Sequence, residues 1–232
     1  MSCGKLFDIQ QLKSPELMNL FNETAQLMDR IDIEIVPDQT HGLSREETPA
    51  HNIIDDSDDP GALIQFSNLL SRDDQIQAIA HEIAHLFLMF NHGLRIRDQS
   101  FSMLGIDPSE SVNITHHLIF TELLKEKYAI GSSLHLDLLR NNISGFLADK
   151  NSPQYVKGLR AYEYERLLGK IEGAANLNSS VKDAFDSAHK YFCNYNSKSI
   201  PTPPSYIEDI RSFLKDTGVI RKGCNSVSKG GS

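Results

Sequence analysis

Residues 72–93, RDDQIQAIAHEIAHLFLMFNHG, decide the fold, and they contain an HExxH motif. Ser71 precedes them and is a residue type that caps helix N-termini, and two aspartates follow where the helix dipole favours negative charge. Gly93 suits the left-handed position just beyond a helix C-terminus. These signals predict one helix over residues 72–91.

Apolar side chains of this helix share one face. At about 100° per residue they form a single stripe, made of Ile76, Ile79, Ile83, Leu86, Phe87 and Phe90. His81 and His85 lie one turn apart on a face about 165° from that stripe. Two imidazoles in this arrangement can bind one tetrahedral zinc ion, and Glu82 can act as general base on a metal-bound water.

This helix resembles the motif helix of the zincin superfamily of zinc metallopeptidases. The resemblance covers residues 62–130 and implies that His81 and His85 bind Zn²⁺ while Glu82 polarises the attacking water. It also implies a twisted sheet beside the motif helix and a helical subdomain. Within the superfamily, HEIAHLFL is similar to the ImmA/IrrE-like group of intracellular regulatory peptidases.

The residues after the motif exclude the metzincin subclass. Its pattern needs a glycine and a third histidine at the positions that hold Leu88 and Asn91. His92 lies about 10 Å along the helix axis from His85, so on an unbroken helix it cannot bind the same ion.

A second helix, expected over residues 108–130, supplies candidates for a third metal ligand. Its segment THHLIFTE, residues 115–122, is apolar on most sides, and a buried imidazole must be hydrogen-bonded or metal-bound. We expect His116 to bind the zinc, because the segment from Thr115 to Phe120 looks like a pattern found in zincins. Four alternatives stay open, namely His117, Glu122, Glu110 and His92.

The rest of the chain predicts an α+β, zincin-like protein. An amphipathic helix over 12–29 precedes an alternating strand over 31–36, and two short strands are expected near 52–54 and 62–66. Further helices are expected near 133–141, 155–175, 180–194 and 205–215. The face over 157–166 is interpreted as solvated surface. We expect a single domain, with an α/β part over 1–92, a helical part over 93–221, and a disordered tail over 222–232.

Composition limits the partners and the compartment. The 232 residues carry a net charge of −8, which argues against a nucleic-acid-binding surface. No apolar stretch is long enough to span a bilayer, and the N-terminus has no apolar signal region. Cys3, Cys193 and Cys224 form neither a disulfide framework nor a CxxC pair, so we expect reduced thiols in the cytoplasm. Export without a cleaved signal and the oligomeric state stay open.

These features predict a zinc-dependent metallopeptidase that hydrolyses a peptide or protein substrate. The alternatives are a catalytically silent zincin-fold regulatory or binding module, and a metal-dependent hydrolase of a non-peptide bond. Several side chains are candidates for stabilising the oxyanion, and the sequence does not choose among them: Tyr128, Tyr155, Tyr162, Tyr164, Tyr191, His135 and His189.

Overall fold

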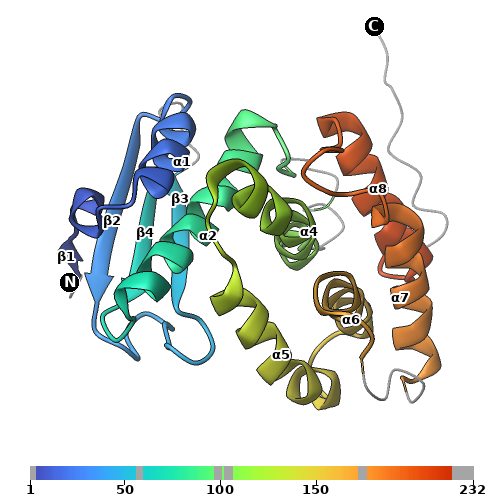
Figure 1. Ribbon diagram of the computed structural model, residues 1–232. Coiled ribbons are helices and arrows are strands. Elements are labelled where there is room, and N and C mark those ends of the chain that lie inside the picture. The colour runs from blue at the N-terminus through green and yellow to red at the C-terminus, as the bar shows by residue number, and fades with distance from the viewer. Residues whose placement is uncertain (1–3, 56–59, 97–100, 102–106, 172–176, 221–232) are drawn as a thin grey trace, which may run out of the picture. The chain divides into compact units, whose positions relative to one another are not determined.

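The computed structural model describes residues 4–55, 60–96, 101, 107–171 and 177–220 (Figure 1). The predicted disordered tail, residues 222–232, lies outside them. The chain divides into two compact units. The first comprises Met1–Gly93, Ile119–Asn142 and Asn196–Lys198, and the second comprises Leu94–Leu118, Ile143–Tyr195 and Ser199–Ser232. The predicted boundary at residue 92 is thus close to the end of the first segment, but residues 119–142 return to the first unit.

A mixed four-stranded sheet forms the base of the first unit. Its strands are β1 (Lys5–Leu6), β2 (Arg30–Val36), β3 (Ala50–Asp55) and β4 (Gly61–Ser67), in the order β1-β2-β4-β3. β2 and β4 are parallel, and the other two pairs are antiparallel. Ile33, Ile64 and Asn52 are register partners across three strands, so they share one face of the sheet.

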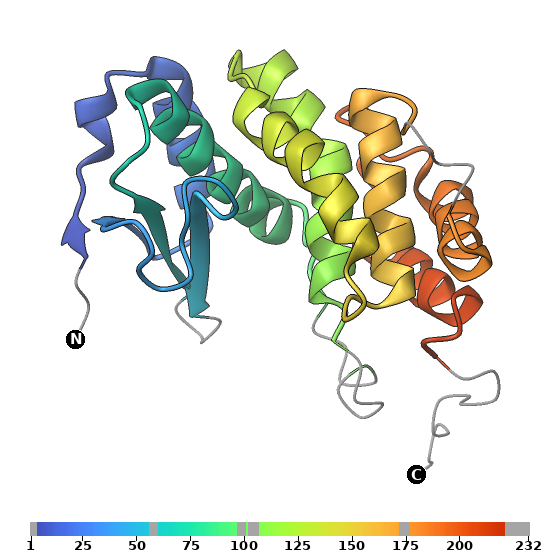
Figure 2. The ribbon, with the colours of Figure 1, turned by 90° about the horizontal axis from the view of Figure 1, so that it is seen from below.

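Helices cover the face of the sheet that carries Ile64. A short 3-10 helix, η1 (Ile9–Leu12), leads into α1 (Pro15–Ala25), and α2 (Arg72–Asn91) packs against α1, β3 and β4 (Figure 2). The opposite face carries a polar ladder in which Gln65 donates to Glu34 at 2.8 Å and lies 3.0 Å from the His51 ring. The alternation predicted for residues 31–36 is therefore confirmed.

The helix that carries the HExxH motif has the predicted bounds. Ser71 Oγ accepts from the Asp74 backbone N–H at 3.2 Å and donates to the Asp74 carboxylate at 2.8 Å. At the other end, Gly93 has a φ of 67°, as expected for a residue just past a helix terminus.

Two helices contribute residues to both units. α4 (Ser109–Tyr128) enters the first unit with its C-terminal half, where Lys127 and Tyr128 bind the Glu23 carboxylate at 2.5 and 2.6 Å. α5 (Ser133–Ala148) starts in the first unit, where the Leu134 N–H donates to the side chain of Gln77 at 2.9 Å. α5 extends seven residues beyond its predicted end at 141.

The second unit is helical. Besides parts of α4 and α5 it contains α6 (Gln154–Leu168), α7 (Ser179–Phe192) and α8 (Pro203–Asp216). Its core is aromatic, with four rings exposed by 1% or less: Tyr162, Tyr206, Phe192 and Phe213. None of the described helices of either unit is long and apolar enough to cross a membrane.

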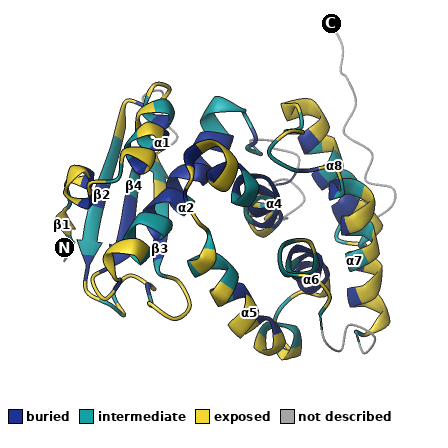
Figure 3. Ribbon diagram, viewed as in Figure 1, coloured by how far each residue is buried: buried dark blue, intermediate teal, exposed yellow. Residues whose placement is uncertain are grey.

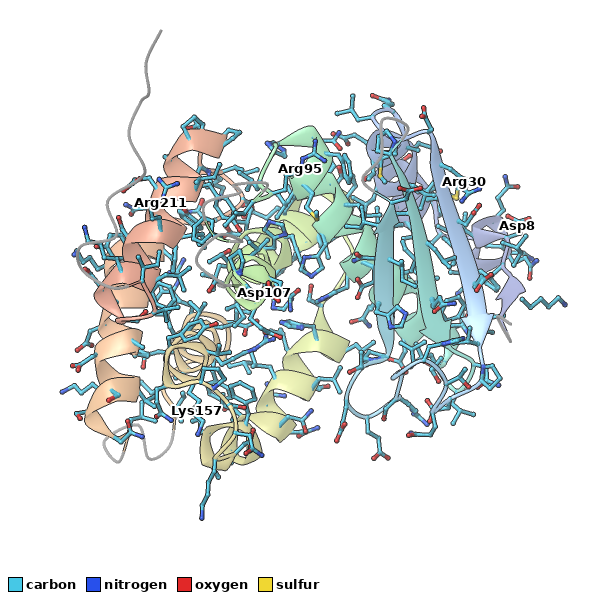
Figure 4. All side chains as sticks on the ribbon, turned by 180° about the vertical axis from the view of Figure 1, so that it is seen from behind. Asp8, Arg30, Arg95, Asp107, Lys157 and Arg211 are labelled. Atoms are coloured by element: carbon cyan, nitrogen blue, oxygen red, sulfur yellow. The ribbon has the colours of Figure 1, made fainter. Side chains whose placement is uncertain are left out.

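The interpretation of residues 157–166 as solvated surface is wrong. Lys157, labelled in Figure 4, is 5% exposed and Glu163 is fully buried, and the burial colours of α6 in Figure 3 agree. α6 packs closely on α7 because Gly158 faces it without a side chain. A Cβ at Gly158 would lie 2.4 Å from Ala184 Cβ and 2.7 Å from the Phe185 nitrogen.

Gly158→Ala should therefore destabilise the second unit, because α7 must move away to admit the methyl group. We expect the free energy of unfolding to fall by about 1–3 kcal/mol in urea denaturation. Gly145→Ala is the matched control: this glycine lies in α5 with nothing within 4 Å of an added Cβ. There the same substitution should raise stability by about 0.5–1 kcal/mol. Equal effects of the two substitutions would refute the close-packing role of Gly158.

Candidate metal centre

The two imidazoles of the HExxH motif converge on one point. His81 Nε2 and His85 Nε2 lie 3.3 Å apart. Two ligands at about 2.0–2.1 Å from a tetrahedral zinc ion are about 3.3–3.4 Å from each other, so the pair fits one ion. Phe120, from the first-unit half of α4, contacts both rings edge-on, with ring centroids 4.8 Å away in each case. Packing against α4 thus helps to hold both imidazoles in place.

Glu82 lies between the two histidines in sequence and is 8% exposed. Burial raises the pKa of its carboxyl to about 7, and a hydrogen bond from Asn52 partly opposes this rise. Asn52 Nδ2 donates to Glu82 Oε2 at 2.5 Å. Asn52 is on β3, facing α2, and nothing in the sequence singled it out.

A third imidazole, that of His135, lies beside the motif histidines within the first unit. It is half-buried on α5, and its ring centroid lies 4.9 Å from that of His81. Among the oxyanion candidates, His135 is thus in contact with a ring of the HExxH motif. Tyr128 donates instead to Glu23, and Tyr191 to Asp216.

The adjacent histidines of α4 have different partners within the second unit. His116 Nε2 lies 2.8 Å from the carbonyl oxygen of Leu94, and burial lowers the pKa of this imidazole to about 4. It is therefore neutral at physiological pH and donates to that carbonyl. His117 Nδ1 lies 2.5 Å from Glu163 Oε1, and both side chains are buried.

His117 shares a helix face with Phe120, which it precedes by one turn of the continuous helix α4. His81, His85 and His117 form a group of side chains that could hold a metal ion, with ligand atoms within 4.8 Å of one another. His117, His135 and Glu163 form a second such group. Among the described residues, His116 belongs to neither group, so the geometry favours His117 over the expected His116 as third ligand.

The other expected alternatives for the third ligand have different partners. Glu122 accepts from the backbone N–H and hydroxyl of Ser197, at 3.1 and 2.8 Å. Glu110 accepts from Arg160 at 3.4 Å. The ring of His92, at the end of α2, packs edge-on against Phe87.

Comparison of the chain with protein-family models, with curated proteins and with solved structures found no match. No known protein therefore indicates the chemistry of the centre, which is inferred from its own residues.

Burial of Glu82 should make the stability of the zinc-free protein depend on pH. Its folded pKa is about 7, above the ordinary 4.5, so its contribution to stability is complete below pH 4.5 and is lost as pH rises through 7. The loss amounts to at most about 3 kcal/mol. Glu82→Gln has no such loss, so in chelator it should unfold at higher urea than wild type at pH 8 and at similar urea near pH 4.5.

The matched control is Glu46→Gln, which changes an exposed carboxylate and should follow the wild-type profile. If Glu82→Gln and wild type have parallel profiles from pH 4.5 to 8, the elevated pKa of Glu82 is refuted.

Proposed function

We propose that this protein is a zinc-dependent peptidase of the zincin type that hydrolyses a peptide or protein substrate. The observation that carries the proposal is the convergence of His81 Nε2 and His85 Nε2 at 3.3 Å beside the buried carboxyl of Glu82. His117 is the proposed third ligand.

The donor set suits zinc. Neutral imidazole nitrogens are typical zinc ligands, whereas calcium and magnesium prefer oxygen. Three protein ligands are also the number typical of catalytic zinc, because structural zinc sites are closed by four. When bound, the ion supplies Lewis acidity that activates a water molecule.

Glu82 supplies the proton transfer. As a buried carboxylate beside the two motif histidines, it can accept a proton from the attacking water and return it to the leaving amine. The hydrogen bond from Asn52 restricts rotation of the carboxylate and so orients it. His135, beside His81, is the proposed donor to the oxygen of the scissile carbonyl as negative charge develops there.

A catalytically silent module and a hydrolase of a non-peptide bond would use the same residues differently. A silent module has no need for an ionisable carboxyl held next to the ligands at a cost in stability, and this favours an enzyme. The cytoplasmic location and the likeness to the ImmA/IrrE-like group stay predictions.

Hydrolysis of a mixed peptide library, followed by mass spectrometry, tests the proposal. Wild type should bind about one equivalent of zinc and cleave peptides, and Glu82→Gln should keep the zinc while its rate falls by about 10²–10⁴-fold, because an amide cannot accept the proton. Glu46→Gln should leave the rate unchanged.

Zinc-loaded wild type that cleaves no peptide would contradict the proposal and favour a silent module, or a non-peptide hydrolase if esters are cleaved instead. Undiminished cleavage by Glu82→Gln would mean that another group is the base.

A further inference from the structure

Glu163 is a buried carboxylate that the proposed reaction does not use. It lies on α6, and both of its oxygens have partners within the second unit. Oε1 is 2.5 Å from His117 Nδ1, and Oε2 accepts from Arg160 Nη1 at 2.8 Å. Arg160 also donates to Glu110 at 3.4 Å, which ties the guanidinium to α4.

The arrangement fixes which nitrogen of His117 carries the proton. Arg160 is permanently charged and donates only, so beside it Glu163 is a carboxylate whose oxygens accept. A histidine that binds a metal ion is neutral, and in that state the single ring proton of His117 must lie on Nδ1, where Oε1 accepts it. This tautomer leaves a lone pair on Nε2 of His117. Nε2 is also the ring nitrogen through which His81 and His85 approach each other.

We infer that Glu163, anchored by Arg160, is a positioning residue that holds His117 in the Nδ1–H tautomer and so presents Nε2 as a ligand. The inference deepens the proposed function and rests on it where the zinc ion is concerned. Carboxylates that bind the distal nitrogen of a zinc-bound imidazole fix its tautomer and orientation, and their loss typically weakens metal binding by about 10–100-fold.

Glu163→Gln gives a directional test because the two ends of an amide differ. Arg160 donates to one end of the side chain, so the glutamine oxygen should turn toward Arg160 and its NH₂ group toward His117. The NH₂ group then donates to Nδ1, and the imidazole proton must move to Nε2, where it opposes metal binding. The substitution keeps the size of the buried side chain, and circular dichroism checks that the variant folds.

Two measurements on the full chain read out the effect. Two-bond ¹H–¹⁵N NMR of the zinc-free protein reports the His117 tautomer, with the signal assigned from His117→Asn. The His117 tautomer should be Nδ1–H in the wild type and Nε2–H in Glu163→Gln. Chelator competition should show zinc affinity about 10–100-fold weaker in Glu163→Gln. Glu165→Gln, half-buried on the same helix, is the matched control and should change neither reading.

An Nε2–H tautomer in the wild type would overturn the inference, and so would a Glu163→Gln variant that loses zinc without a change of tautomer. Should Glu163→Gln fail to fold, the wild-type tautomer still decides. Failure of the wild type to bind zinc would instead defeat the proposed function, and the tautomer measurement in the zinc-free protein keeps the two failures distinct.

Discussion

The 3.3 Å separation of His81 Nε2 and His85 Nε2 depends on the regularity of α2, and the rest of the centre is arranged around it. A helix stacks residues four apart on one face, but their side chains can still turn away from each other. Here the edge-on contacts with Phe120 hold both rings, so their convergence is set by packing within the protein. Two imidazoles already held in this arrangement would need little rearrangement to bind an ion.

Burial of the Glu82 carboxyl lowers the stability of the fold near neutral pH. A buried carboxylate with one amide donor is poorly compensated for lost water, and this is why its pKa rises to about 7. A buried carboxyl that lowers stability near neutral pH is more typical of a functional site than of core packing.

Local signals made the motif helix and the strands around it predictable. The cap at Ser71, the left-handed Gly93 and the alternation over residues 31–36 each act over a few residues, and α2 and β2 have nearly the predicted bounds. β1 was missed because two residues are too few to show a period. α4 ends at Tyr128, with Ala129 at a φ of 54°, two residues before the expected end at residue 130.

The parts of the site that depend on long-range packing were not predictable. His116 and His117 differ by about 100° around a helix that is apolar on most sides, so only the docking of other elements decides which one faces the centre. Glu163 was missed because a buried, paired glutamate has the same sequence signature as a solvated one. Asn52 likewise reaches the Glu82 carboxylate only because β3 lies beside α2.

The most direct test of the centre is a crystal structure with zinc, with diffraction data collected at the zinc absorption edge. We expect one anomalous peak at about 2.0–2.1 Å from the Nε2 atoms of His81, His85 and His117, with a non-protein oxygen as the fourth ligand. A site closed by four protein side chains, or no peak at His81 and His85, would contradict a catalytic zinc centre built on this helix, and a peak at His116 in place of His117 would contradict the assignment of the third ligand.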